Sequence, residues 1–230
     1  MLKYFIKISF ILLSINLSAQ QDSLQTSLDS LVPHKRQPVK IRIGFDAGKY
    51  IWARLNDSES YDFYIDANFY KNYYLIFLTG YENHLTNSSL LTYHTTGNYY
   101  KLGIDYNIYE NWLDMDNDIT IGVRYAYAGF DYQLNSFRIN QPEAVITPEI
   151  NEVNKYFTNL SAHWLDFTAK IQAETFKNVY LGYAVSLKYL MSYSDPDDFE
   201  VLYIPGFFER NSYSNFGFGM QYFISYRFKF

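Results

Sequence analysis

The sequence predicts an all-β chain that forms a single antiparallel, up-and-down transmembrane β-barrel of about eight strands. Apolar and polar residues alternate in one segment after another, the pattern of strands whose two faces meet different surroundings. Tyr and Phe are abundant, with 25 and 19 copies, yet the mean hydropathy is only −0.24. All six prolines fall outside the alternating segments, as a hydrogen-bonded sheet interior requires.

The first three predicted strands cover residues 41–53, 61–70 and 73–82. In the first, an apolar row that includes Ile41 alternates with a polar row that includes Arg42. The second alternates in the same way. The third is less regular, but Gly80 and Glu82 mark its polar face. The pair Lys71-Asn72 separates the second and third strands and predicts a tight turn.

The next five strands follow the same period of two residues. They are predicted at residues 99–109, 118–130, 162–174 and 179–192, and over the C-terminal segment that begins near Asn215. Short links are expected near 71–72, 109–117 and 175–178, and long links near 83–98, 131–161 and 193–213. The link 54–60 is short and breaks this alternation. Short periplasmic turns and long external loops are typical of outer-membrane barrels. No segment has a convincing helical period.

The first 19 residues have the composition of a secretory signal. Lys3 and Lys7 precede a short apolar run, and Ala19 supplies a small residue before the expected cleavage site. The run is roughly ten residues long, against the ~18 that a membrane-spanning helix needs. We therefore expect a cleaved signal peptide at 1–19, a periplasmic leader at 20–40, and a barrel at 41–230 in the outer membrane. The alternative is a retained membrane anchor.

Alternation alone does not say whether the apolar rows face lipid or a dry core. A soluble barrel of the lipocalin kind places its apolar rows inward. Here the apolar rows are almost free of charge over about ten residues, the length of a tilted spanning strand, and aromatic residues gather near the strand ends. We therefore predict that the apolar rows face lipid. Lys49 is the one cation that this assignment places in a lipid-facing row.

The polar rows then fill the barrel interior. A barrel of about eight strands is just wide enough for its own side chains, and buried charges persist when they are paired. We expect a structural network of lumen charges formed by Arg42, Asp46, Asp66, Glu82, Lys101, Asp105, Arg124, Asp166, Lys170, Lys188 and Arg227. The alternative is that these residues line a narrow ion-conducting pore or a proton relay.

The sequence offers little catalytic chemistry. A serine hydrolase needs a His beside a Ser and a carboxylate, but strand periodicity puts Ser161 and His163 on one face and Asp166 on the other. The segment 114–118 begins like a calcium loop but has Ile119 where that loop needs Gly. An acidic segment at 195–200 is read as a solvated loop, with bridging of divalent cations as the alternative. We expect no cofactor, no metal site and no nucleic-acid partner, and the absence of Cys excludes disulfides.

The C-terminal strand carries a row of large apolar residues that ends at the last position of the chain: Tyr222, Ile224, Tyr226, Phe228 and Phe230. This ending resembles the closing strand of bacterial outer-membrane β-barrels. The resemblance implies that the row is an assembly signal recognised by the barrel-assembly machinery.

Four segments, 17–20, 99–106, 180–188 and 203–207, resemble an uncharacterised family of small outer-membrane barrels from Bacteroidota, of the OmpA/OmpX size class. The resemblance implies a monomer in contact with outer-membrane lipids and lipopolysaccharide. We expect a non-enzymatic barrel that is structural or binds an unknown extracellular partner through its long loops. The alternative is an outer-leaflet enzyme that modifies lipid A as an acyltransferase or deacylase.

Overall fold

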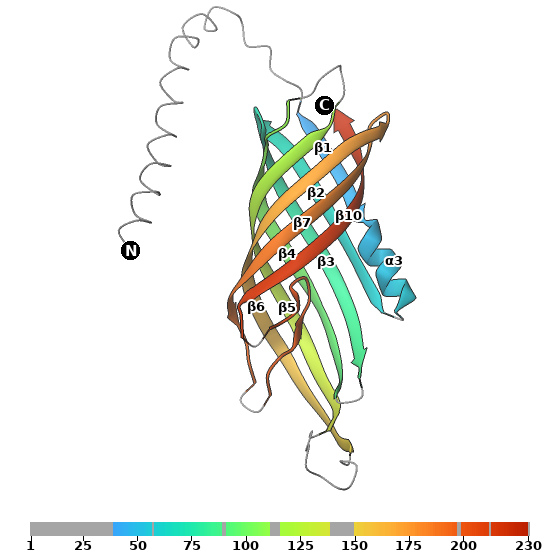
Figure 1. The fold of residues 1–230 in the computed structure, drawn as a ribbon, viewed down its shortest axis with the longest axis vertical. Coiled ribbons are helices and arrows are strands. Elements are labelled where there is room, and N and C mark those ends of the chain that lie inside the picture. Colours follow the sequence, from blue (N-terminus) through green and yellow to red (C-terminus); the bar gives the residue numbers. More distant parts are fainter. Residues whose placement is uncertain are drawn as a thin grey trace, which may run out of the picture. The chain divides into compact units, whose positions relative to one another are not determined.

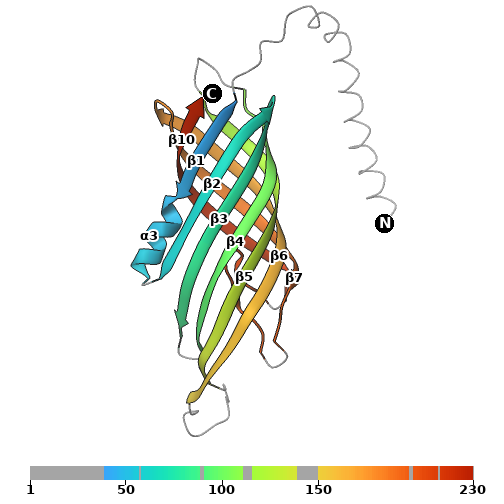
Figure 2. The same ribbon diagram turned by 180° about the vertical axis from the view of Figure 1, so that it is seen from behind.

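The structure is a computed structural model that describes residues 39–56, 58–88, 91–110, 116–138, 150–196, 199–211 and 213–229. Eight long strands form a closed antiparallel barrel in the order β1-β10-β7-β6-β5-β4-β3-β2, and β8 and β9 form a separate two-stranded hairpin (Figures 1 and 2). The predicted fold class is therefore confirmed. The predicted signal peptide, most of the predicted leader and Phe230 lie outside the described residues.

The barrel strands are β1 (Lys40–Asp46), β2 (Glu59–Tyr70), β3 (Tyr73–Asn87), β4 (Leu91–Asn107), β5 (Asp118–Arg138), β6 (Ile150–Phe176), β7 (Val179–Tyr193) and β10 (Phe216–Lys229). The hairpin strands are β8 (Tyr203–Ile204) and β9 (Phe208–Glu209), and one helix, α3, covers Ala47–Leu55. The tight turn at Lys71-Asn72 and the turn at Lys177-Asn178 lie at the barrel end where β10 finishes (Figure 1). Lys71 and Asn178 adopt positive φ angles of 43° and 64° there.

Side-chain exposure alternates along each strand as the sequence predicts. In β3, Phe77 is 41% exposed on the outside of the barrel, whereas its neighbours Ile76 and Leu78 are 1% and 0% exposed. In β10, Met220 and Tyr222 are exposed and the intervening Gln221 is buried. The apolar rows therefore form the outer surface, and the barrel interior is filled by side chains.

The predicted strand over residues 41–53 is wrong in its second half, because β1 ends at Asp46 and α3 follows. The Asp46 carboxylate accepts a hydrogen bond from the backbone N–H of Lys49 at 3.0 Å, which satisfies one of the free donors of the first helical turn. After Asp46, the residues that face the barrel recur at helical spacing. These residues are Lys49, Ala53 and Asn56. The expectation that the chain has no helix is wrong for the same reason.

Two of the predicted long links are largely strand. Residues 83–98 contain the end of β3 and the start of β4, joined around Ser88, and residues 131–161 contain the ends of β5 and β6. The long β5–β6 pair has register shifts between Phe130 and Tyr132 and between Leu134 and Ser136. These bulges let the pair bend as it continues past the other strands (Figure 2). The third predicted long link, 193–213, contains the small β8–β9 hairpin.

Within the described part of the chain, no helix has the length and apolar character needed to cross a membrane.

Candidate functional site

The predicted lumen residues all lie inside the barrel. Each is at most 4% exposed: Arg42, Asp46, Asp66, Glu82, Lys101, Asp105, Arg124, Asp166, Lys170, Lys188 and Arg227. Most of them form groups of ion pairs and hydrogen bonds that follow one another along the barrel, and we call these groups layers.

The first layer lies near the turn end of the barrel. The Arg42 guanidinium donates to Asp66 at 2.7 Å and forms a second ion pair with Asp118. Arg227 pairs with Asp116 and, at 3.1 Å, with Glu174. The guanidinium planes suit such multiple contacts, because each presents several donors in a fixed geometry.

Asp66 connects the first layer to the next. Its other carboxylate oxygen lies 3.2 Å from the Lys170 ammonium. Lys170 also lies 3.4 Å from Asp105, which pairs with Arg124 at 3.1 Å. Removing one partner of such a buried pair leaves an uncompensated charge in a poorly solvated interior. The free-energy cost of that charge is larger than the net stabilisation that the intact pair provides.

The third layer surrounds Asp166. Its carboxylate accepts from the Lys101 ammonium at 2.6 Å and from the Trp164 indole N–H at 2.8 Å. Lys188 lies in the same region but donates instead to two backbone carbonyl oxygens, those of Gly206 at 2.8 Å and Phe207 at 3.2 Å. Both carbonyls belong to the turn between β8 and β9.

The β8–β9 hairpin therefore occupies the barrel lumen. Ile204 and Phe207 are 0% and 1% exposed, and the Phe207 ring meets Trp164 edge-on, with ring centroids 5.8 Å apart. Gly206 has a φ of 76°, and a Cβ at this position would lie 2.5 Å from the Tyr99 ring. Glycine fits here because it tolerates positive φ and leaves room for the close approach.

A fourth layer forms around Lys49. The prediction that Lys49 lies in a lipid-facing row is therefore wrong. The Lys49 ammonium points inward and pairs with Asp62 at 2.8 Å and with Glu82. Glu82 also accepts from the Tyr203 hydroxyl of the hairpin at 2.8 Å. Burial, followed by the nearby Glu82 carboxylate, raises the pKa of Tyr203 well above its usual value, so this phenol remains a donor. Asp46, in contrast, caps α3 and also accepts from the Tyr222 N–H at 3.2 Å.

Among the described residues, six charged participants in these layers are absent from the predicted set: Lys40, Lys49, Asp62, Asp116, Asp118 and Glu174. Asp62 and Asp118 stand in the polar rows of β2 and β5, so periodicity alone identifies them. Asp116 and Asp118 belong to the acidic segment that begins like a calcium loop, and they pair with Arg side chains here. Among the described residues, no group of three or more His, Asp or Glu is placed to hold a metal ion.

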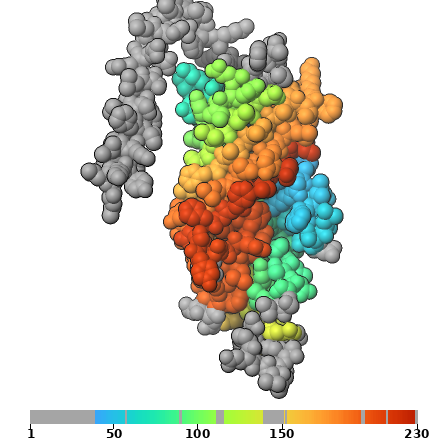
Figure 3. Space-filling view, viewed as in Figure 1, coloured from blue at the N-terminus to red at the C-terminus, as the bar shows by residue number. Residues whose placement is uncertain are grey.

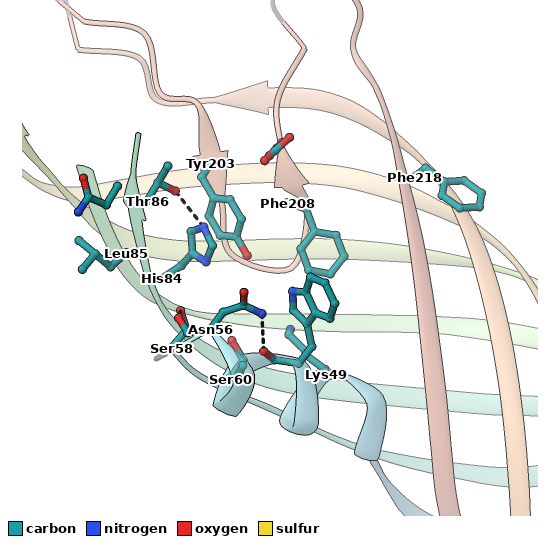
Figure 4. Close-up of a pocket in the computed structure, with 14 residues that line it drawn as sticks. Lys49, Asn56, Ser58, Ser60, His84, Leu85, Thr86, Tyr203, Phe208 and Phe218 are labelled. Atoms are coloured by element: carbon teal, nitrogen blue, oxygen red, sulfur yellow. Dashed lines mark hydrogen bonds between the residues drawn. The ribbon is translucent and has the colours of Figure 1, made fainter. Parts of the chain in front are cut away.

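A cavity of about 690 Å³ opens beside this fourth layer (Figure 4). It is bordered by α3, the far end of β3, the β8–β9 hairpin and Phe218 of β10. His84 lines one side, where its ring stacks on Tyr203 at 4.2 Å and its Nε2 atom lies 3.0 Å from the Thr86 hydroxyl. No pattern in the sequence indicates this cavity, because it depends on the helix that replaces the end of β1.

The residues considered for a serine hydrolase do not assemble into a triad. The Nδ1 atom of His163 lies 2.6 Å from the Tyr125 hydroxyl on the outer face. The Ser161 hydroxyl lies 3.2 Å from that of Ser194. Asp166 points into the lumen, where its carboxylate accepts a hydrogen bond from Lys101.

The proposed assembly row lies on the outer face of β10. Tyr222, Ile224, Tyr226 and Phe228 are between 36% and 55% exposed, and β10 pairs with β1 on one side and β7 on the other. The strand therefore closes the barrel. Phe230 is outside the described residues.

The sequence matches the family described as "Domain of unknown function (DUF6048)" over residues 1–230. No curated protein matches the chain. The crystal structure of Ail, the attachment invasion locus protein of Yersinia pestis, has a TM-score of 0.39 and 12% identity, with 84% of this chain and 99% of that chain covered. A major outer membrane protein from Thermus thermophilus has a TM-score of 0.44 and 15% identity, with 83% and 99% covered.

Proposed function

Because the chain belongs to the DUF6048 family, whose description names no activity, we propose a function from the geometry of its barrel. The protein is a sealed, non-enzymatic outer-membrane barrel that presents the projecting ends of β3 to β6 as a binding surface outside the cell. The observation that supports this proposal most directly is that paired charges and the β8–β9 hairpin occupy the lumen.

The outer surface supports a membrane location. Cross-strand aromatic pairs mark two levels of the wall: Tyr73 faces Tyr106 near the turn end, and Tyr61 faces Tyr81 nearer the other end. Between these levels the exposed residues are apolar, as Leu75 and Ile104 illustrate. A Lys or Arg at the bilayer midplane costs about 2–4 kcal/mol, and the charged residues of this zone point inward instead.

The projecting strand ends support a binding role. β5 and β6 remain paired as far as Arg138 and Ile150, and Phe199 of the link after β7 packs against Tyr132 and Phe157. This packing stiffens the projection. Rigid elements hold a binding surface in one conformation and so reduce the entropy lost on binding.

The proposal extends to partners and origin. The terminal row serves the barrel-assembly machinery, the apolar wall contacts outer-membrane lipids and lipopolysaccharide, and the barrel works as a monomer with a partner outside the cell. Origin in Bacteroidota and cleavage of the signal peptide stay predictions. An enzyme that modifies lipid A changes its acyl chains, so we expect mass spectra of lipid A to be identical in cells with and without the gene.

Single-cysteine labelling tests the location and orientation, because the chain contains no Cys. Tyr156→Cys places a thiol at a 67% exposed position on the projecting part of β6, and Lys177→Cys places one in a turn at the opposite end. On intact cells, a membrane-impermeant maleimide is expected to label Tyr156→Cys and not Lys177→Cys. After lysis it should label both. Labelling of Lys177→Cys alone on intact cells contradicts the proposal.

A further inference from the structure

The barrel wall has a gap in its strand pairing. Residues 216–222 of β10 and 59–62 of β2 have no strand between them, because β1 ends at Asp46. The helix α3 covers this stretch instead, and Figure 3 shows its side chains directly against those of β10. A helix has already paired its backbone groups along its own axis, so it closes the wall through side chains and leaves space behind it.

That space is the cavity of about 690 Å³ described above, which we call the end cavity. Its lining includes Leu85 and Asn87, which follow Tyr81 in β3 and so lie beyond the aromatic level of the wall. Both side chains are exposed, as are those of Asn56 and Glu209 on the same cavity. The end cavity therefore opens to water at the end of the barrel from which the strands project.

Aromatic rings form one side of the end cavity. The His84 ring stacks on that of Tyr203, with centroids 4.2 Å apart and 11° between the ring planes. Phe208 of the hairpin has a φ of 80°, a conformation that non-glycine residues rarely adopt and that occurs most often at functional sites. Trp52 of α3 borders the same cavity and is 70% exposed. The cavity thus offers several ring surfaces to a ligand.

Uncharged polar groups form the other side. In Figure 4, Asn56, Ser58 and Ser60 lie across the cavity from Phe208. Ser60 is only 8% exposed, and its hydroxyl has no hydrogen-bond partner among the described residues. A buried hydroxyl without a partner is costly, so it is available to a hydrogen-bonding group that enters the cavity.

The charges around the end cavity disfavour an anionic ligand. Lys49 is the one Lys or Arg among the described residues that line it, and its ammonium is held by the carboxylates of Asp62 and Glu82. Burial lowers the pKa of His84, so this ring is neutral near pH 7. Glu209 adds an exposed carboxylate. A phosphate, sulfate or carboxylate group would therefore find no free cation here.

We propose that the end cavity binds an uncharged pyranose sugar of a soluble extracellular glycan. A pyranose ring has a face of C–H groups that packs on aromatic rings, and its hydroxyls both donate and accept hydrogen bonds. These two properties match the aromatic side and the polar side of the cavity. Its volume lies within the range of about 300–1,000 Å³ for small-molecule sites. The inference rests on the proposed function, because it names the ligand class for the end of the barrel that faces outward.

Saturation-transfer NMR tests the proposal. Purified full-length protein is kept in amine-oxide micelles, since the head group of a maltoside detergent is itself a sugar. The probes are the methyl pyranosides of glucose, galactose, mannose and N-acetylglucosamine, with glucuronate as the charged comparison. We expect transfer to at least one uncharged pyranoside, strongest at the C–H protons of one ring face, and none to glucuronate. Transfer to no uncharged pyranoside, or equal transfer to glucuronate, overturns the proposal.

A mixture of short uncharged peptides tests the other class of ligand that aromatic and amide groups suit. If these peptides receive saturation and displace a bound pyranoside, the end cavity is a peptide site and the proposal is wrong. We expect the peptides to leave the pyranoside signal unchanged.

A matched pair of variants assigns the binding to this cavity. Trp52→Ala removes an exposed ring from its border, whereas Ile51→Ala changes a 58% exposed neighbour on α3 that is not among the described lining residues. We expect binding to weaken about fivefold or more in Trp52→Ala and to stay unchanged in Ile51→Ala. Equal affinity in the two folded variants overturns the assignment. Heat-modifiable gel migration establishes folding, and the wild-type measurement decides the proposal if Trp52→Ala does not fold.

Failure of this inference is distinguishable from failure of the proposed function. Sugar binding is measured on purified protein and does not depend on how the barrel is oriented in a membrane. The maleimide labelling of Tyr156→Cys on intact cells decides the orientation separately. Labelling as expected together with absent sugar binding overturns the end cavity alone.

Discussion

The ammonium of Lys188 lies 2.8 Å from the carbonyl oxygen of Gly206, so a side chain of the barrel wall holds the turn of the β8–β9 hairpin inside the lumen. The same ammonium donates to Phe207 at 3.2 Å and lies 3.9 Å from the centre of the Phe208 ring. Lys101 adds a longer contact to Gly206 at 3.4 Å. The link after β7 is therefore part of the lumen filling and is fastened by buried cations.

Replacing Lys188 by Met should loosen the hairpin. Met retains much of the side-chain volume but donates nothing, so the Phe207 carbonyl loses its Lys188 partner and the hairpin opens more often. Hydrogen exchange measured by mass spectrometry should show faster exchange across residues 203–208, with the strands unchanged. Lys177→Met, in an exposed turn, is the control and should leave the hairpin unaffected. Equal protection in both variants contradicts a fastening role for Lys188.

Gly206→Ala should loosen the same hairpin from the other direction. A methyl group there meets the Tyr99 ring at 2.5 Å, and the φ of 76° is unfavourable for alanine. Exchange at 203–208 should again accelerate. Gly129→Ala is the matched control, because the nearest atom to a Cβ at Gly129 is 3.4 Å away. If both variants exchange like the wild type, the hairpin is not packed against Tyr99.

Asp66→Asn should destabilise the barrel strongly. Asp66 pairs with Arg42 and Lys170 at once, so its loss leaves two buried cations with fewer partners, and a cost of about 3–5 kcal/mol is expected. Urea unfolding followed by heat-modifiable gel migration measures it. Combining Asp66→Asn with Lys170→Met should recover part of the loss. Glu59→Gln, at an exposed position, should change stability by less than about 0.5 kcal/mol.

Asp46→Ala should weaken the start of α3. The substitution removes the acceptor for the Lys49 N–H and for the Tyr222 N–H, with an expected loss of about 1 kcal/mol from the cap. Asp46→Ser keeps a capping oxygen and should retain most of the stability. The same urea titration compares the two. Equal loss in both variants means that the charge of Asp46, and not its cap, stabilises this segment.

The regular part of the barrel follows from periodicity. In β10, alternation between residues such as Met220 and Gln221 correctly separates the outer wall from the lumen, because a strand reverses its side chains at each step. The predicted lumen residues are buried for the same reason. Periodicity also finds Asp62 and Asp118 once the polar rows are followed to the strand ends.

The helix α3, the place of the hairpin in the lumen and the cavity could not be predicted from the sequence, because they depend on contacts between segments that are distant in the chain. The change from a period of two to a helical period at Asp46 is short, and the alternation of residues 41–47 masks it, so Lys49 is assigned to the wrong face. The hairpin is local in sequence, but its place in the lumen depends on Lys188 and Tyr99 from other strands. The cavity beside the Lys49 layer depends on both features and has no sequence pattern of its own.

Current recording across a planar bilayer tests the central claim that the lumen is sealed. Purified full-length protein, shown to be folded by its gel migration, is inserted and recorded under a constant applied voltage. We expect baseline current without a steady open level, because the layers around Asp66, Asp166 and Lys49 and the β8–β9 hairpin fill the path. A large, steady open conductance from the wild-type protein would contradict the account.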